Sequence, residues 1–141
     1  MTAREFLTRP ARLQRQIVMK QHRIDFLRRL STAVSTPQRE ISVQSTPDPT
    51  RMQAFLAEVA DEEKEVRRLK EAWRQALAET ALVISLLPDE RMIELLELKY
   101  LEEYTWSEIV CRVNSCRSHV FHLHQAALEW LDRLPEIRNA E

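Results

Sequence analysis

Apolar side chains recur at helical spacing along most of this chain, and the pattern predicts two long helices followed by three shorter ones. The first long helix opens at a Thr2–Glu5 capping box, in which each side chain satisfies a backbone N–H of the other residue. Pro10 lies inside this helix and predicts a bend, because proline has no N–H to donate to the preceding turn. The apolar positions that fit a heptad seam are Phe6, Leu13, Ile17, Ile24 and Leu27.

A second long helix is predicted from a capping box at Thr50 and Gln53 as far as Pro88. Its seam comprises Met52, Leu56, Val59, Val66, Trp73, Leu77, Ile84 and Leu87. Glu63 and Lys70 interrupt that seam, and polar groups at such positions lower stability while restricting register.

Residues 35–50, between the two long helices, are rich in Pro, Ser and Thr and predict a flexible loop. The loop is long enough for the helices to pair as an antiparallel hairpin within one chain. The alternative is a homodimer through the long helices. We therefore predict an all-α protein with a long-helix hairpin or coiled coil at 1–87 and a separate domain at 88–141.

The C-terminal domain is predicted to contain a helix over 89–102 and then two helices that meet at a tight turn. Thr105 and Glu108 form a capping box, and Asn114, which tolerates the left-handed conformation, offers a place for that helix to end. The next helix begins at Ser115 or Cys116 and turns one apolar stripe inward: Val120, Leu123, Ala127, Leu128 and Leu131. A small core is expected from Leu95, Tyr100, Trp106, Ile109, Leu123 and Leu128.

The opposite face of the last helix presents Arg117, Ser118, Phe121, His122 and Gln125. Two helices joined in this way form a helix-turn-helix pattern, whose second helix can place outward side chains against base edges in the major groove of DNA. The same spacing also fits a plain helical corner in an all-helical protein.

The runs 95–101 (Leu-Leu-Glu-Leu-Lys-Tyr-Leu), 105–109 and 120–128 resemble, in order and spacing, the fourth region of bacterial sigma factors. The chain is most similar to small phage-encoded late-gene regulators of the RinA and ArpU kind. This resemblance implies a sigma-like helix-turn-helix that binds double-stranded promoter DNA, with Arg117, Ser118, Phe121 and His122 on the recognition face. It also implies contact with RNA polymerase around residues 90–104, in the cytoplasm of a bacterial host cell.

Charge is divided unevenly along the chain, although the net charge is only −1. Residues 88–141 hold six Lys or Arg against eleven carboxylates, whereas residues 1–50 hold nine against four. Because phosphate neutralisation supplies much of the affinity of DNA-binding proteins, Arg12 and Arg15 are candidate phosphate contacts. The acidic C-terminal segment favours the alternative function, an adaptor that binds polymerase or another phage protein without reading DNA. A third candidate, a DNA-packaging protein, requires a ring-forming oligomer.

Other classes of protein find little support in the sequence. No apolar run approaches the ~18 residues that a membrane span needs, and no signal segment is recognisable, so we expect no membrane partner and a cytosolic location. There is no glycine in the chain, hence no glycine-rich phosphate loop, and no nucleophile motif, so we expect no enzyme activity. The spacing of Cys111, Cys116, His119, His122 and His124 matches no zinc pattern, and we expect reduced cysteines, solvated histidines, no metal and no cofactor.

Overall fold

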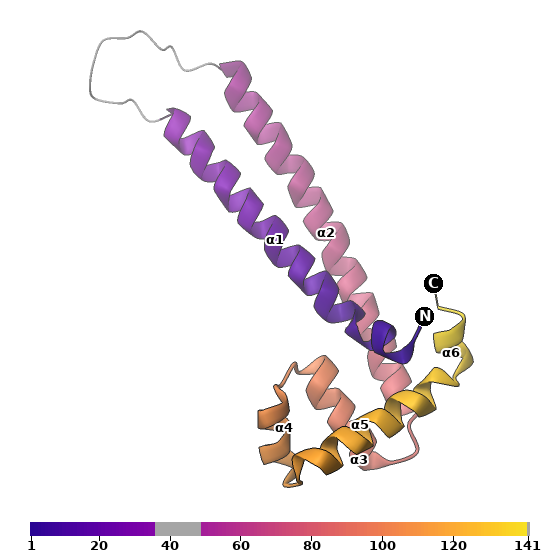
Figure 1. Ribbon diagram of the computed structural model, residues 1–141. Coiled ribbons are helices and arrows are strands. Elements are labelled where there is room, and N and C mark those ends of the chain that lie inside the picture. Colours follow the sequence, from indigo (N-terminus) through magenta and orange to yellow (C-terminus); the bar gives the residue numbers. More distant parts are fainter. Residues whose placement is uncertain (36–48, 141) are drawn as a thin grey trace. The chain divides into compact units, whose positions relative to one another are not determined.

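The computed structural model describes residues 1–35 and 49–140, and their regular structure is entirely helical (Figure 1), which confirms the all-α prediction. Most of the predicted loop, residues 36–48, lies outside the described residues. The elements in chain order are α1 (Ala3–Ser35), α2 (Pro49–Ser85), α3 (Glu90–Leu96), the π-helical turn η1 (Glu97–Leu101), α4 (Trp106–Val113), α5 (Arg117–Asp132) and α6 (Pro135–Arg138). Among the described residues, no helix is both long and apolar enough to cross a membrane.

The two long helices begin in different ways. At the start of α1 the predicted capping box is present, with the Thr2 amide donating to Glu5 Oε2 at 2.8 Å and the Glu5 amide donating to Thr2 Oγ1 at 3.2 Å. The helix then continues through Pro10. The predicted start of α2 is wrong: the helix begins at Pro49, so Thr50, the predicted cap, lies inside it. Proline suits this position, since its missing N–H is one that no intrahelical carbonyl would accept.

The chain forms two compact units. One consists of Gln14–Glu71 and contains one stretch of each long helix. Here α1 and α2 lie side by side as an antiparallel hairpin (Figure 1); a homodimer through these helices stays a prediction. A narrow apolar seam is buried between them: Ile17, Ile24, Leu27, Val59, Val66 and Leu69.

The other unit combines Met1–Leu13 with Ala72–Glu141, so the compact units divide the chain elsewhere than at the predicted boundary between 87 and 88. Both long helices supply one end to the core of the C-terminal helices. The buried members of that core are Ala3, Phe6, Leu7, Val83, Ile84, Leu87, Leu96, Tyr100, Ala127, Leu128, Leu131 and Ile137. The start of α1 is also fastened directly to α5, because the Ala3 amide donates to Asp132 Oδ1 at 2.6 Å.

Several predicted core positions are corrected by the structure. Leu56 is 53% exposed and Lys70 is exposed, whereas Leu69, Ala76, Thr80 and Val83 are buried instead. The seam of α2 alternates steps of three and four residues, and the prediction followed only some of them. The small C-terminal core is likewise divided: Tyr100 and Leu128 join the larger core, while a second cluster buries Leu95, Leu98, Ile109 and Val120.

The predicted helix over 89–102 changes type halfway. Asp89 caps α3 as expected, accepting from the Arg91 amide at 2.9 Å. In η1 the Glu102 amide then donates to the Glu97 carbonyl at 3.0 Å, five residues back. Glu103 follows with φ of 57°, a left-handed conformation that glycine usually supplies in other proteins. The chain therefore leaves the π-helical turn abruptly and enters α4.

Candidate nucleic-acid interface

The α4–α5 corner is built from short-range hydrogen bonds that the sequence specifies. The Glu108 amide donates to Thr105 Oγ1 at 3.3 Å and the Thr105 amide donates to Glu108 Oε2 at 3.0 Å, so the predicted capping box is present. Asn114 ends α4 in the left-handed conformation, with φ of 52° and ψ of 44°. Of the two predicted starts of the next helix, Cys116 takes the cap position, while the Ser115 hydroxyl donates back to the Val113 carbonyl at 3.5 Å.

The inward face of α5 attaches the helix to the rest of the domain. Four members of the predicted stripe are buried, and Leu123 is half-buried: Val120, Ala127, Leu128 and Leu131 have exposed fractions between 0% and 5%. Val120 packs in the cluster with Ile109 of α4, and Leu131 packs in the larger core. This anchoring sets which side chains of α5 face solvent.

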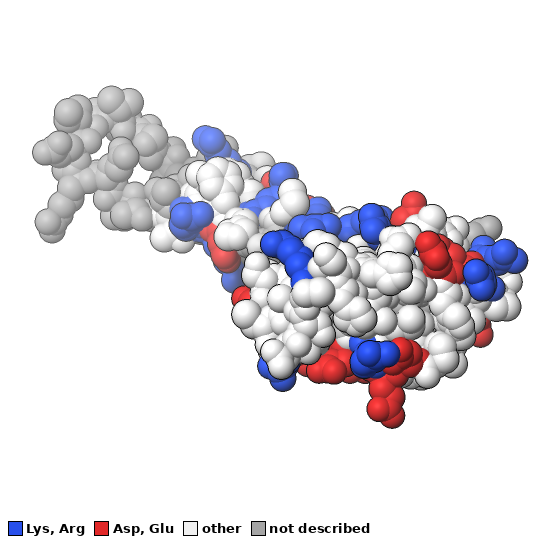
Figure 2. All heavy atoms as spheres, turned by 60° about the horizontal axis from the view of Figure 1, so that its bottom comes forward, with Lys and Arg blue, Asp and Glu red and all other residues white. Residues whose placement is uncertain are grey.

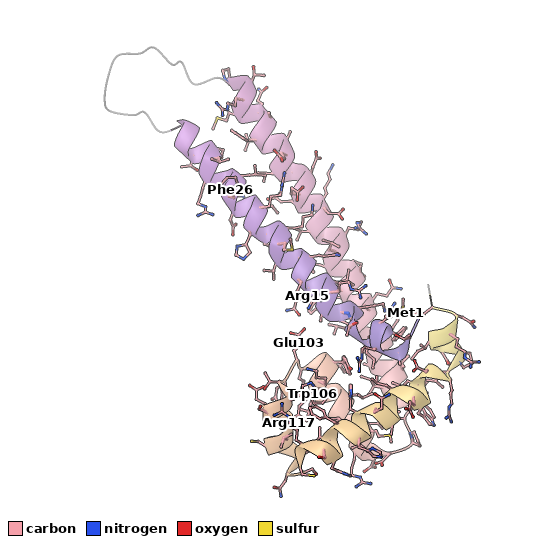
Figure 3. All side chains as sticks on the ribbon, in the orientation of Figure 1. Met1, Arg15, Phe26, Glu103, Trp106 and Arg117 are labelled. Carbon is pink, nitrogen blue, oxygen red and sulfur yellow. The ribbon has the colours of Figure 1, made fainter. Side chains whose placement is uncertain are left out.

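The outward face of α5 carries every residue predicted to read DNA. Arg117, Ser118, Phe121, His122 and Gln125 are all exposed, as the helical spacing predicted. Contact of these residues with DNA stays a prediction. Figure 3 shows Arg117 close to Trp106 at the α4–α5 corner.

Aromatic rings fix the orientation of that outward face. The Phe121 ring, 40% exposed, meets the ring of Trp106 edge-on at 4.9 Å between centroids. The Arg117 guanidinium carbon lies 5.5 Å from the centre of the Phe121 ring, within the range of a cation–π contact. Lys99 Nζ lies 4.7 Å from the centre of the Trp106 ring. Trp106 thereby connects η1 to the first turns of α5.

His124 departs from the prediction that the histidines are solvated. It is 6% exposed, whereas His119 and His122 are exposed. Its Nε2 is 2.7 Å from the Tyr100 hydroxyl, and its ring meets Trp106 edge-on at 4.8 Å. A helical count would have found this position, because His124 lies four residues after Val120 and three before Ala127, both on the inward stripe.

The Tyr100–His124 pair is held in its neutral state. Burial, with the positive charges of Arg4 and Lys99, lowers the pKa of His124 from 6.5 to about 4. Burial also raises the pKa of Tyr100, an effect that the charge of Arg4 opposes. At neutral pH the phenol is therefore protonated and the imidazole uncharged, so the Tyr100 hydroxyl can donate a hydrogen bond to Nε2 of His124. The pair is a buried polar link between η1 and α5.

The charge around the corner is mixed. In the view of Figure 2 a wide uncharged surface is flanked by groups of Lys and Arg and by groups of Asp and Glu. Arg12 and Arg15, the predicted phosphate contacts, are both exposed on α1.

Cys111 and Cys116 are exposed and unpaired.

Comparison of the chain with protein-family models, with curated proteins and with solved structures found no match.

Proposed function

We propose that this protein is a transcription regulator of the phage type, which binds double-stranded promoter DNA through α5 and contacts RNA polymerase. The observation that carries the proposal is the two-sided character of α5, a helix of 16 residues. One side is anchored in two apolar clusters, and the other exposes hydrogen-bonding side chains at the start of the helix after a tight turn. In helix-turn-helix proteins the recognition helix contacts base edges with its N-terminal residues.

The exposed side chains of α5 suit base readout. An arginine such as Arg117 can donate two hydrogen bonds to O6 and N7 of guanine, and a glutamine such as Gln125 can pair with N6 and N7 of adenine. Phe121 offers an apolar contact to a thymine methyl group. Because Phe121 packs against Trp106, the side chain of Arg117 above it starts from a restricted position. Such restriction lowers the entropy that binding would cost.

The C-terminal segment is acidic, so most phosphate contacts have to come from other parts of the chain. We assign this role to Arg12 and Arg15, which are both exposed on α1; the charge of Arg12 also contributes to lowering the pKa of Glu5. Removing both should reduce the slope of log affinity against log salt by about 2, since each released counterion contributes about 0.9. An unchanged slope would remove them from the interface.

The proposal is tested by selecting bound sequences from a random duplex library at low and near-physiological salt. Wild type should enrich one motif, whereas Arg117→Ala combined with His122→Ala should lose that enrichment. Arg117→Ala alone should cost about 1–3 kcal/mol on the selected site if the arginine pairs with a guanine. Equal weakening on every sequence would instead identify Arg117 as a phosphate contact.

A matched control is available on the same helix. Arg133 is exposed at the C-terminal cap of α5, so Arg133→Ala removes the same charge from the other end. This variant should keep the motif and most of the affinity.

The second candidate function is an adaptor that binds RNA polymerase or another phage protein without reading DNA. The exposed carboxylates of Glu90, Glu94 and Glu97, along α3 and the start of η1, favour it because they would repel phosphate. Failure of folded wild-type protein to enrich any sequence at either salt concentration would favour this candidate over DNA reading.

A further inference from the structure

A hollow of about 560 Å³ lies between the start of α1, the last turns of α2, and α6 with the residues after it. All the residues that line it belong to the unit of Met1–Leu13 and Ala72–Glu141. Phe6 and Val83, which are 4% and 5% exposed, form the apolar floor. Leu82 and Leu86 form one wall and are 68% and 47% exposed. We call this hollow the α2–α6 groove.

The α2–α6 groove shares no residue with the proposed DNA-binding surface, because neither the outward residues of α5 nor Arg12 and Arg15 line it. Leu82 lies in the last turn of α2, and Leu86 directly follows the end of the helix. The two exposed side chains are four residues apart and form a short apolar ridge at this end of α2. Ridges of this spacing fit the groove of a second helix. Leu82 and Leu86 are exposed and are not members of the domain's buried core, and an exposed apolar surface beside a hollow is a feature of binding sites.

The charged residues that line the groove leave one negative charge unpaired. Arg9 and Glu79 neutralise each other through an ion pair of 2.8 Å, and the Arg9 guanidinium also lies 3.9 Å from the centre of the Phe6 ring. Glu136, on the α6 side, has no cation within ion-pair distance among the described residues. The unpaired charge facing an occupant is therefore negative.

We propose that the α2–α6 groove binds an amphipathic helix of a partner protein, with apolar side chains on the face that covers Leu82 and Leu86 and a Lys or Arg beside Glu136. An enclosed small-molecule site buries most of its ligand, whereas a wall as exposed as that of Leu82 and Leu86 would leave such a ligand in contact with solvent. A helix is about 10 Å wide and covers both leucines at once. A symmetric second copy is disfavoured because it would oppose the negative groove with itself.

The test uses two synthetic helical peptides as probes and the full chain as the receptor. Both peptides carry leucine at i, i+3, i+4 and i+7, and they differ only in having Lys or Glu beside the leucine stripe. Fluorescence anisotropy should show the Lys peptide binding about tenfold more tightly than the Glu peptide, a difference of about 1.4 kcal/mol. Glu136→Lys should abolish or reverse this preference. Binding of neither peptide by wild type would overturn the proposal, and so would a preference unchanged in Glu136→Lys.

The apolar wall is tested separately. Leu82→Ser combined with Leu86→Ser should weaken both peptides by at least about tenfold. Because both side chains are exposed, the variant should keep its helical circular dichroism. Leu56→Ser is the matched control, since Leu56 is 53% exposed on α2 but lies in the other unit, and it should bind like wild type. Equal binding by the double variant would overturn the proposal. A concentration-dependent increase in mass that the double variant abolishes would replace the partner helix with a second copy.

Discussion

The two compact units are stabilised in different ways. The hairpin of Gln14–Glu71 buries one seam between two helices, and ion pairs flank that seam: Lys20 with Glu62 at 3.0 Å, Arg23 with Glu58 at 2.8 Å, and Arg28 with Glu63. The unit with the C-terminal helices buries side chains from α1, α2, α3, η1, α5 and α6 in one core and includes a buried polar pair.

This difference shows where each unit should be sensitive. A seam covered on two sides only can adjust when a side chain is shortened, and ion pairs between exposed groups contribute little and are screened by salt. A core enclosed by several elements cannot collapse around a cavity as easily, and a buried titratable group makes its stability depend on pH. Mutations, changes of pH and changes of salt concentration should therefore affect the stability of the two units differently.

The largest effect is expected from Leu131→Ala. Leu131 is fully buried in the core of the C-terminal helices, so its replacement leaves a cavity and should lower the free energy of unfolding by about 3–4 kcal/mol. Leu27→Ala in the hairpin should cost about 2 kcal/mol, because Leu27 is buried between two helices only. Urea unfolding followed by circular dichroism measures both. A larger loss for Leu27→Ala would reverse the comparison.

The next effect is the pH dependence of the C-terminal unit. His124 has a folded-state pKa of about 4 against 6.5 when unfolded, so between these values the unfolded chain binds more protons than the folded one. Stability should be complete above pH 6.5, fall as the pH drops towards 4, and level off below. The two pKa values differ by about 2.5, so protonation of this one group should lower the free energy of unfolding by about 3 kcal/mol from above pH 6.5 to below pH 4.

Two variants isolate the contribution of His124 from that of the carboxylates, which also titrate in acid. His124→Gln keeps a hydrogen-bonding group beside Tyr100 but cannot be protonated, so its loss of stability between pH 6.5 and 4 should be smaller than that of wild type. His119→Gln, at an exposed position of the same helix, should follow wild type. If His124→Gln also followed wild type, the buried imidazole would not be the cause.

Local sequence patterns predicted the helices and their ends better than they predicted the buried polar pair and the groove formed by tertiary packing. The capping box at Thr105, the left-handed end at Asn114 and the inward stripe of α5 involve residues close in sequence, so spacing was sufficient to locate them. Helical spacing along α5 could also have predicted that His124 is buried. The α2–α6 groove was not, because it joins Phe6 to Glu136 through tertiary packing that spacing does not report.

A smaller loss of stability is expected when an ion pair between the two helices of the hairpin is removed. The Glu62 side chain, 17% exposed, lies 3.0 Å from Lys20 and 3.9 Å from Arg23 of the other helix, so Glu62→Gln should cost up to about 1 kcal/mol. Glu65→Gln removes a carboxylate paired with Arg68 on the same helix and should cost less than Glu62→Gln, because water screens this exposed pair. The cost of Glu62→Gln should shrink in about 1 M NaCl, where the Debye length is about 3 Å. A cost independent of salt in urea unfolding would argue for packing instead.

The smallest effect concerns the backbone between η1 and α4, in a chain without glycine. Glu103 has φ of 57°, which costs an L-residue about 1–2 kcal/mol, and glycine relieves that cost while losing about 0.5–1 kcal/mol of chain entropy. Glu103→Gly should therefore raise the free energy of unfolding by a few tenths to about 1 kcal/mol. Its neighbour Glu102 has φ of −96° and ψ of −8°, so Glu102→Gly makes the same change of charge with only the entropic loss and should destabilise. Opposite signs for two adjacent, equally charged substitutions would assign the effect to the backbone, whereas equal signs would assign it to the lost carboxylate.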